Sequence, residues 1–93
     1  MRLVERCTDG WLFWCPGCGE PHRFSDGWAF SGTPESPTFQ PSLAVLGFNP
    51  DGSRGPNRCH LFVTAGRIQY QQDCVHLLAG KTVPMETVDR FTS

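Results

Sequence analysis

The feature that most constrains the fold of this chain is the motif Cys15-Pro16-Gly17-Cys18-Gly19 near its start. Two cysteines separated by two residues can direct both thiolates at one metal ion, and the glycines permit the tight turn that this needs. A redox-active pair would be expected to open a helix, whereas this motif follows an apolar run from Trp11 to Trp14 that is typical of a strand. The motif therefore favours zinc over redox chemistry.

The composition also suits a metal-stabilised fold. A chain of 93 residues forms one domain at most, and so small a core benefits from a cross-link. Five cysteines are an odd number, which argues against a complete disulfide framework. Ten glycines and eight prolines favour short strands and turns over long helices. We therefore predict a mainly β, single-domain protein over 1–93, stabilised by zinc and built from zinc-ribbon-like hairpins.

Short apolar runs between turn residues predict the strands. These are expected at 2–6, 11–14, 22–24, 28–30, 43–48 and 81–85. The proline-rich stretch from Ser31 to Ser42 predicts an extended strap, because proline does not suit a central strand or a helix interior. A surface loop is expected at 49–57 and a tail at 86–93.

A β-hairpin is predicted over 59–72, with the break between its strands at Ala65-Gly66. We expect a three-residue loop, because Ala65 would resist the positive φ of a two-residue turn. In that register His60 shares an apolar face with Phe62, Ile68 and Tyr70. The one short helix that we expect lies at 74–79, between a capping Asp73 and Gly80.

The remaining zinc ligands are expected at the two ends of this hairpin. Cys59-His60 begins it and Cys74-Val75-His76 follows it, so the hairpin brings both segments together. Neighbouring residues on a strand face opposite sides, so each segment is expected to provide one ligand. We favour a closed four-thiolate site for one structural zinc ion, formed by Cys15, Cys18, Cys59 and Cys74, with His60 and His76 as the substitutes.

Two other residues are weaker candidates for the metal site. His22 lies four residues after Cys18 and is interpreted as a surface strand residue, with a ligand or a hydrogen-bonding neighbour of the metal as the alternatives. Cys7 has no partner at metal-binding spacing and is expected to be a small buried apolar residue.

The ends of the hairpin also contain the parts of an active site. His60, Asp73 and His76 are residue types found in acid-base pairs and metal sites, so a metal-dependent hydrolase that uses them is one alternative. Each also has a structural explanation: His60 would pack in the core, Asp73 would cap the expected helix, and His76 would lie on the polar face of that helix. No Ser-His-Asp spacing signature is apparent, so we expect no catalytic residues and favour a role other than catalysis.

Charge and hydropathy narrow the possible partners. The formal net charge is -1, and the arginines are scattered and offset by acids, which argues against phosphate-backbone binding. A zinc-ribbon nucleic-acid binder is therefore kept only as a further alternative. The apolar runs are far shorter than the roughly 20 residues that cross a bilayer, and no secretory signal is visible at the start. We expect a cytoplasmic setting without a membrane partner.

Several of these segments together resemble a known family of small phage and prophage proteins of unknown function, often labelled "ammonia monooxygenase". The resemblance rests on Phe13 to Gly19 with His22, Pro37 to Leu43, Cys59 to Phe62 with Gly66, and Asp73 to His76 with Ala79 to Val83. It implies a zinc-binding phage gene product made in a bacterial host. The label conflicts with the sequence. That enzyme class is a copper-dependent membrane oxidase, whereas this chain has no apolar run long enough to cross a membrane, and its cysteine-rich ligands suit zinc better than an oxygen-activating copper site.

These observations predict a phage accessory protein that acts through protein–protein contacts. Its partner is expected to be a host or virion protein, and its location the host cytoplasm or the virion. Aromatic side chains and the strap from Ser31 to Ser42 are the expected contact regions.

Overall fold

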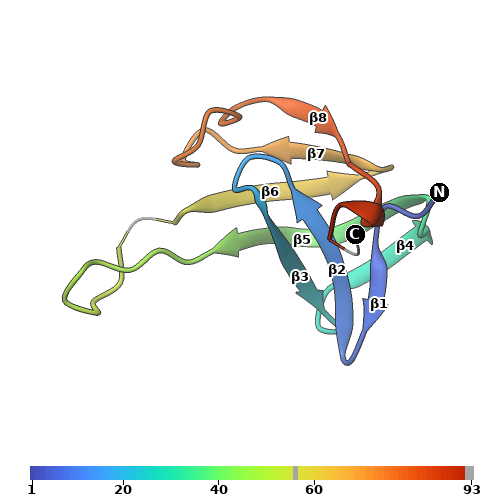
Figure 1. The fold of residues 1–93 in the computed structure, drawn as a ribbon, viewed down its shortest axis with the longest axis horizontal. Coiled ribbons are helices and arrows are strands. Elements are labelled where there is room, and N and C mark those ends of the chain that lie inside the picture. Colours follow the sequence, from blue (N-terminus) through green and yellow to red (C-terminus); the bar gives the residue numbers. More distant parts are fainter. Residues whose placement is uncertain (56, 92–93) are drawn as a thin grey trace.

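In the computed structural model, which describes residues 1–55 and 57–91, the chain forms two antiparallel sheets (Figure 1). The smaller sheet contains β1 (Glu5–Cys7), β2 (Gly10–Cys15) and β3 (Glu20–Ser25) in that order. The larger sheet has the order β4 (Ala29–Thr33), β5 (Ser36–Val45), β6 (Cys59–Thr64), β7 (Arg67–Tyr70) and β8 (Thr82–Pro84). A short 3-10 helix, η1, spans Val88–Phe91. The predicted mainly β fold class is confirmed.

An aromatic stack joins the two sheets. The ring of Phe24 on β3 lies 4.1 Å from that of Phe39 on β5, measured between centroids, and the two rings are parallel within 1°. Phe13 on β2 stacks on Phe24 at 5.3 Å. All three are almost fully buried, so the core lies between the sheets and leaves the outer face of the larger sheet to solvent.

The proline-rich stretch 31–42 belongs to the larger sheet, so the prediction of a strap was wrong. Most of it lies in β5, which pairs with β4 on one side and β6 on the other. Pro41 follows a cis peptide bond and lies where the pairing with β6 shifts between Phe39 and Leu43. Proline is tolerated there because the irregularity interrupts the ladder that would need its missing amide hydrogen.

The β6–β7 hairpin has a two-residue turn and not the expected three-residue loop. Ala65 has a φ of 48° and Gly66 a φ of 76°, both in the left-handed region. The Ala65 amide donates to Thr38 Oγ1 at 2.8 Å, and the Gly66 amide donates to the Pro37 carbonyl at 2.9 Å. These bonds to a neighbouring strand hold Ala65 in a conformation that its Cβ disfavours.

The shorter turn reverses the expected faces of β6. Cys59, Leu61 and Val63 point into the core, whereas His60 and Phe62 lie on the outer face. The prediction that His60 shares the buried face was therefore wrong, because a shift of one residue exchanges the faces of a strand. This exchange turns a thiol inward and an imidazole outward at the start of the same strand.

Residues 71–80 form consecutive turns, so no helix is present at the predicted positions 74–79. The Gln71 carbonyl accepts hydrogen bonds from the amides of Cys74 and Gly80, each at 3.3 Å, which closes this segment into a compact loop. β8 follows at the place of the predicted edge strand.

The stretch 86–93, predicted as a tail, contains η1. Val88 is buried there, and its amide donates to the Arg2 carbonyl at 3.1 Å. Residues 92–93 lie outside the described part of the chain. Within 1–55 and 57–91, no helix has the length and apolar character needed to cross a membrane.

Candidate functional site

Three thiols and one imidazole converge where the two sheets meet. Cys15 and Cys18 come from the turn after β2, Cys59 is the first residue of β6, and His76 lies in the 71–80 turns. Their ligand atoms all lie within 4.8 Å of one another. A group of three cysteines and one histidine at this spacing could hold a metal ion.

The turn after β2 is shaped to fit the histidine. The Cys18 amide donates to Cys15 Sγ at 3.4 Å, so the backbone of the turn supports a thiolate. Gly17 lies against the imidazole of His76, and a side chain at residue 17 would collide with that ring. The Tyr70 hydroxyl lies 3.1 Å from Cys15 Sγ and accepts a hydrogen bond from the Gly17 amide. A glycine is therefore required where the turn approaches His76.

The electrostatics of the group favour a bound cation. Hydrogen bonding from Cys59 lowers the pKa of Cys15 to about 3 against the opposing effect of burial, with smaller contributions from His22 and Tyr70. Burial and the neighbouring Cys15 thiolate raise the pKa of Cys18 to about 11. The first deprotonated thiol thus hinders the next, and a divalent cation would remove this repulsion and deprotonate all three.

Cys74, expected as the fourth ligand, lies outside this group. Its Sγ is 3.2 Å from both the amide nitrogen and the carbonyl oxygen of His60, so it accepts one hydrogen bond and donates another. β7 ends at Tyr70, opposite Leu61, so beyond this point the thiol bonds to the backbone of β6 where a strand residue would otherwise do so. The 71–80 turns contribute His76, the predicted substitute, to the cluster instead.

A second polar constellation lies on the outer face of the larger sheet. Ser42 Oγ is 3.0 Å from His60 Nε2, and His60 Nδ1 is 3.3 Å from each carboxylate oxygen of Asp73. One tautomer satisfies every contact: the Ser42 hydroxyl donates to Nε2, and Nδ1–H donates to the carboxylate. In the triads of serine hydrolases, the serine is likewise hydrogen-bonded to the histidine, and the histidine to the aspartate.

The triad is open to solvent. The His60 side chain is 30% exposed and that of Asp73 is 55% exposed. A shallow cavity of about 560 Å³ adjoins both and is otherwise lined by Gln69, Tyr70, Gln71, Gln72 and Gly80. A large molecule can therefore approach the imidazole from outside the sheet.

Ser42 is positioned by the irregular part of β5. It lies between Phe39 and Leu43, where the register with β6 shifts. Its carbonyl accepts a hydrogen bond from Trp28 Nε1 at 3.2 Å, and the Trp28 ring packs edge-on against Phe24 in the core. This contact connects the backbone of the serine to the rigid aromatic stack.

The three residues proposed for a metal-dependent hydrolase are divided between the two sites. His60 and Asp73 lie together, but His76 belongs to the metal-binding cluster, and Ser42 completes the polar group instead. Sequence reasoning missed Ser42 because the triad joins three segments that are distant in sequence. The available signal was its presence in the segment Pro37 to Leu43, one of those that support the family resemblance.

His22 and Cys7 also have defined places. His22, predicted on the surface, is buried, with its ring 5.8 Å from that of Phe13 in an edge-on contact. Cys7, expected to be buried, is half-buried at the end of β1 and lies outside the metal-binding cluster.

Fold and sites together define a small β protein that combines a Ser-His-Asp constellation with a cysteine-rich cluster. The family model described as "Bacterial ubiquitination-like system serine protease (BubE)" matches residues 2–71, and the chain belongs to this family. Ser42 and His60 lie inside the matched range, and Asp73 follows shortly after it. No curated protein and no solved structure matches the chain.

Proposed function

We propose that this protein is a serine protease of a bacterial ubiquitination-like system, with Ser42 as the nucleophile, His60 as the general base and Asp73 as the group that orients the imidazole. The observation that carries the proposal is the continuous chain of hydrogen bonds through these three side chains. The family description supports the same class of reaction, since it names a serine protease.

The geometry accounts for each proton in peptide hydrolysis. Ser42 Oγ bonds to the carbonyl carbon of the scissile peptide while His60 Nε2 accepts the hydroxyl proton. The imidazolium gives this proton to the leaving amine as the C–N bond breaks, which leaves an ester on Ser42. A water molecule, deprotonated by His60, then hydrolyses the ester and restores the serine. Asp73 keeps Nδ1 protonated and stabilises the imidazolium throughout.

Labelling with a fluorophosphonate tests this proposal without knowledge of the substrate. We expect covalent modification of Ser42 in the parent, and a rate at least about a thousandfold lower in Ser42→Ala and His60→Ala, because nucleophile and base act as a unit. Ser31→Ala removes an exposed serine from β4 and is the matched control, which should react like the parent. A parent that does not react, or a Ser42→Ala variant that reacts normally, would contradict the proposal.

We also propose that the metal-binding cluster holds one structural zinc ion. Three thiolates and an imidazole suit Zn²⁺ better than magnesium or calcium, which prefer oxygen ligands. With four protein ligands, no coordination position is left for a substrate. The metal would then stabilise the fold while the triad performs the chemistry, in place of the metal-dependent hydrolysis considered from the sequence.

Native mass spectrometry tests the ligand set. The parent is expected to retain one zinc ion, and Cys59→Ala and His76→Ala are expected to lose it, because each removes a ligand. Cys74→Ala is the matched control, since it removes a buried thiol outside the cluster, and it should keep the ion. Zinc lost from Cys74→Ala and kept by His76→Ala would restore the four-thiolate set predicted from the sequence.

The protein partner expected from the sequence becomes a protein substrate in this proposal. A host or virion protein as that partner, a phage origin, and the host cytoplasm or virion as the location stay predictions. The expectation that nucleic acid is not a partner also stays a prediction, with a zinc-ribbon nucleic-acid binder as its alternative.

A further inference from the structure

The last part of β5, which follows the proposed nucleophile, pairs with β6 but not with β4. Its pairing with β4 ends where Ala29 faces Gln40, whereas its pairing with β6 continues to Val45. The chain then extends into an arm, residues 46–55, which projects away from the two sheets (Figure 1). Among the described residues, no strand pairs with the outer side of 42–48.

The backbone hydrogen bonds show which groups of β5 face the open side. The His60 amide donates to Cys74 Sγ, and the His60 carbonyl accepts from the Gln71 amide at 2.8 Å. His60 therefore directs its backbone groups away from β5, which makes its pair with Ala44 a non-hydrogen-bonded one. The amide and carbonyl of Ala44 consequently point to the open side.

The same alternation continues along the arm. The Gly47 carbonyl accepts from the Gly55 amide at 3.0 Å, and the Asn49 amide donates to the Ser53 carbonyl at 2.8 Å. Phe48 lies between these inward-facing residues, so its backbone groups point outward, and the period of two places those of Leu46 outward as well. Ala44, Leu46 and Phe48 thus present a row of main-chain donors and acceptors, which we call the substrate edge.

The triad is directed at this edge. Asp73 lies in the turns beyond β7, His60 on β6 and Ser42 on β5, so the three groups follow one another across the sheet. A carbonyl carbon attacked by Ser42 Oγ lies on the side of the serine away from His60. On that side the Trp28 indole donates to the Ser42 carbonyl, and the open edge of β5 begins directly after it, at Ala44.

We propose that the substrate binds as an extended strand paired with the substrate edge, which carries its scissile bond to Ser42. This inference rests on the proposed protease function and names the substrate class: a flexible, extended polypeptide segment. An unpaired edge provides main-chain hydrogen bonds to an added strand, whereas a compact loop cannot use several of them at once.

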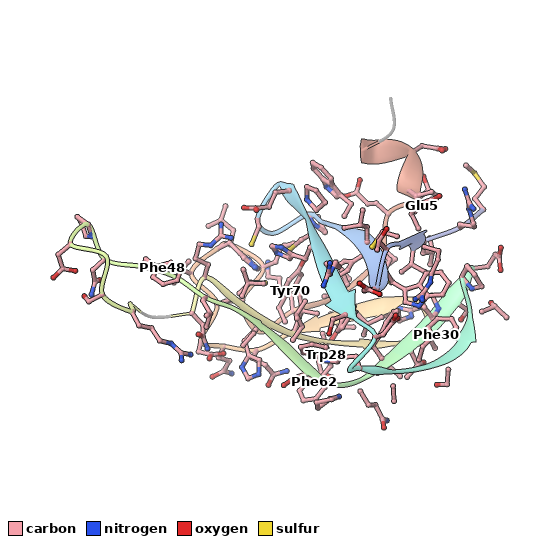
Figure 2. The ribbon with its side chains drawn as sticks, turned by 90° about the horizontal axis from the view of Figure 1, so that it is seen from below. Glu5, Trp28, Phe30, Phe48, Phe62 and Tyr70 are labelled. Carbon is pink, nitrogen blue, oxygen red and sulfur yellow. The ribbon has the colours of Figure 1, made fainter. Side chains whose placement is uncertain are left out.

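Side chains beside the edge indicate a preference. Leu46 is 42% exposed and Phe48 is 68% exposed, and Figure 2 shows Phe48 on the projecting arm. Both share the face of Ser42 because they follow it at even spacing. Substrate residues that face them, every second position on one side of the scissile bond, are therefore expected to be apolar.

The test compares Ala44→Pro with Ala44→Val in two assays. Proline removes the outward amide hydrogen and leaves the bonds to β6 intact, whereas valine keeps the amide. The first assay is fluorophosphonate labelling, which needs no strand pairing. The second is cleavage of a library of unfolded peptides from a bacterial proteome, read by mass spectrometry. We expect Ala44→Pro to lose at least about tenfold more in peptide cleavage, through a higher KM, than in labelling rate, and to cleave the peptides less efficiently than Ala44→Val, which keeps the amide.

Equal cleavage by the two variants would overturn the inference, and so would a parent that labels on Ser42 yet cleaves no peptide of the library. A parent that fails to label would instead contradict the proposed function. Should Ala44→Pro fail to fold, the double variant Leu46→Ser/Phe48→Ser provides the test. It is expected to lose the preference for apolar residues at alternate positions, and an unchanged preference would overturn the inference.

Discussion

The thiol of Cys74 is hydrogen-bonded to the main chain of His60, on the side of β6 that faces away from β5. It accepts a hydrogen bond from the His60 amide and donates one to the carbonyl, while the preceding residue, Asp73, binds the imidazole. Two consecutive residues therefore fix both the backbone and the ring of the proposed general base. Sulfur forms weak hydrogen bonds, but their loss would leave the His60 amide without this partner and free the ring to shift.

Cys74→Ala is expected to lower kcat about tenfold with little change in KM, because a small displacement of the imidazole is costly for proton transfer. Cys74→Ser keeps a donor and an acceptor and should recover most of the rate. The NMR signal of the His60 Nδ1 proton, bonded to Asp73, should broaden in the alanine variant only. Cys7→Ala is the matched control at a half-buried thiol. A Cys74→Ala variant with the parent's rate and proton signal would refute this role.

At the scale of elements, the apolar pattern of the sequence predicts where strands lie better than how they pair. The segments expected at 11–14, 22–24 and 81–85 correspond to β2, β3 and β8, because their local alternation and turn residues are sufficient signals. The β6–β7 register is different. It depends on Thr38, 27 residues before Ala65, which supports a turn that alanine alone would disfavour.

The same contrast holds for the candidate sites: residues that are close in sequence could be placed from the sequence, whereas residues brought together from distant segments could not. The CxxC spacing predicts that Cys15 and Cys18 face one point, because the turn between them is local. The place of His76 depends on the path of the 71–80 turns, where the Val75 amide donates to the Arg58 carbonyl at 3.2 Å. Ser42 reaches His60 through the irregularity in β5. Pro41 is a local signal for such an irregularity, but it does not predict which residue will lie beside His60.

At the scale of the whole molecule, the metal-binding cluster and the triad are built on the same two elements, β6 and the 71–80 turns. Cys59 of the metal-binding cluster precedes His60 of the triad on β6, and the 71–80 turns contribute both Asp73 and His76. A zinc ion bound as proposed would join the turn after β2, the start of β6 and the 71–80 turns. It would thereby fix the distance between the general base and its carboxylate without touching the substrate.

Removal of zinc by a chelator is therefore expected to affect stability and reactivity together. We expect the free energy of unfolding in urea to fall by at least about 3 kcal/mol, because a metal bound only by the folded state contributes folding energy. The fluorophosphonate reaction at Ser42 should decline in parallel and return when zinc is added back. A metal-free chain that keeps its stability or its labelling rate would contradict this coupling.

Because Trp28 Nε1 donates a hydrogen bond to the carbonyl of Ser42, the fluorescence of Trp28 can report on the state of the proposed nucleophile. An indole that donates to the backbone of the nucleophile senses changes in polarity when that residue is acylated. With Trp11 and Trp14 replaced by phenylalanine, Trp28 would be the sole tryptophan emitter. Stopped-flow fluorescence could then time the formation and hydrolysis of the acyl-enzyme on unmodified substrates.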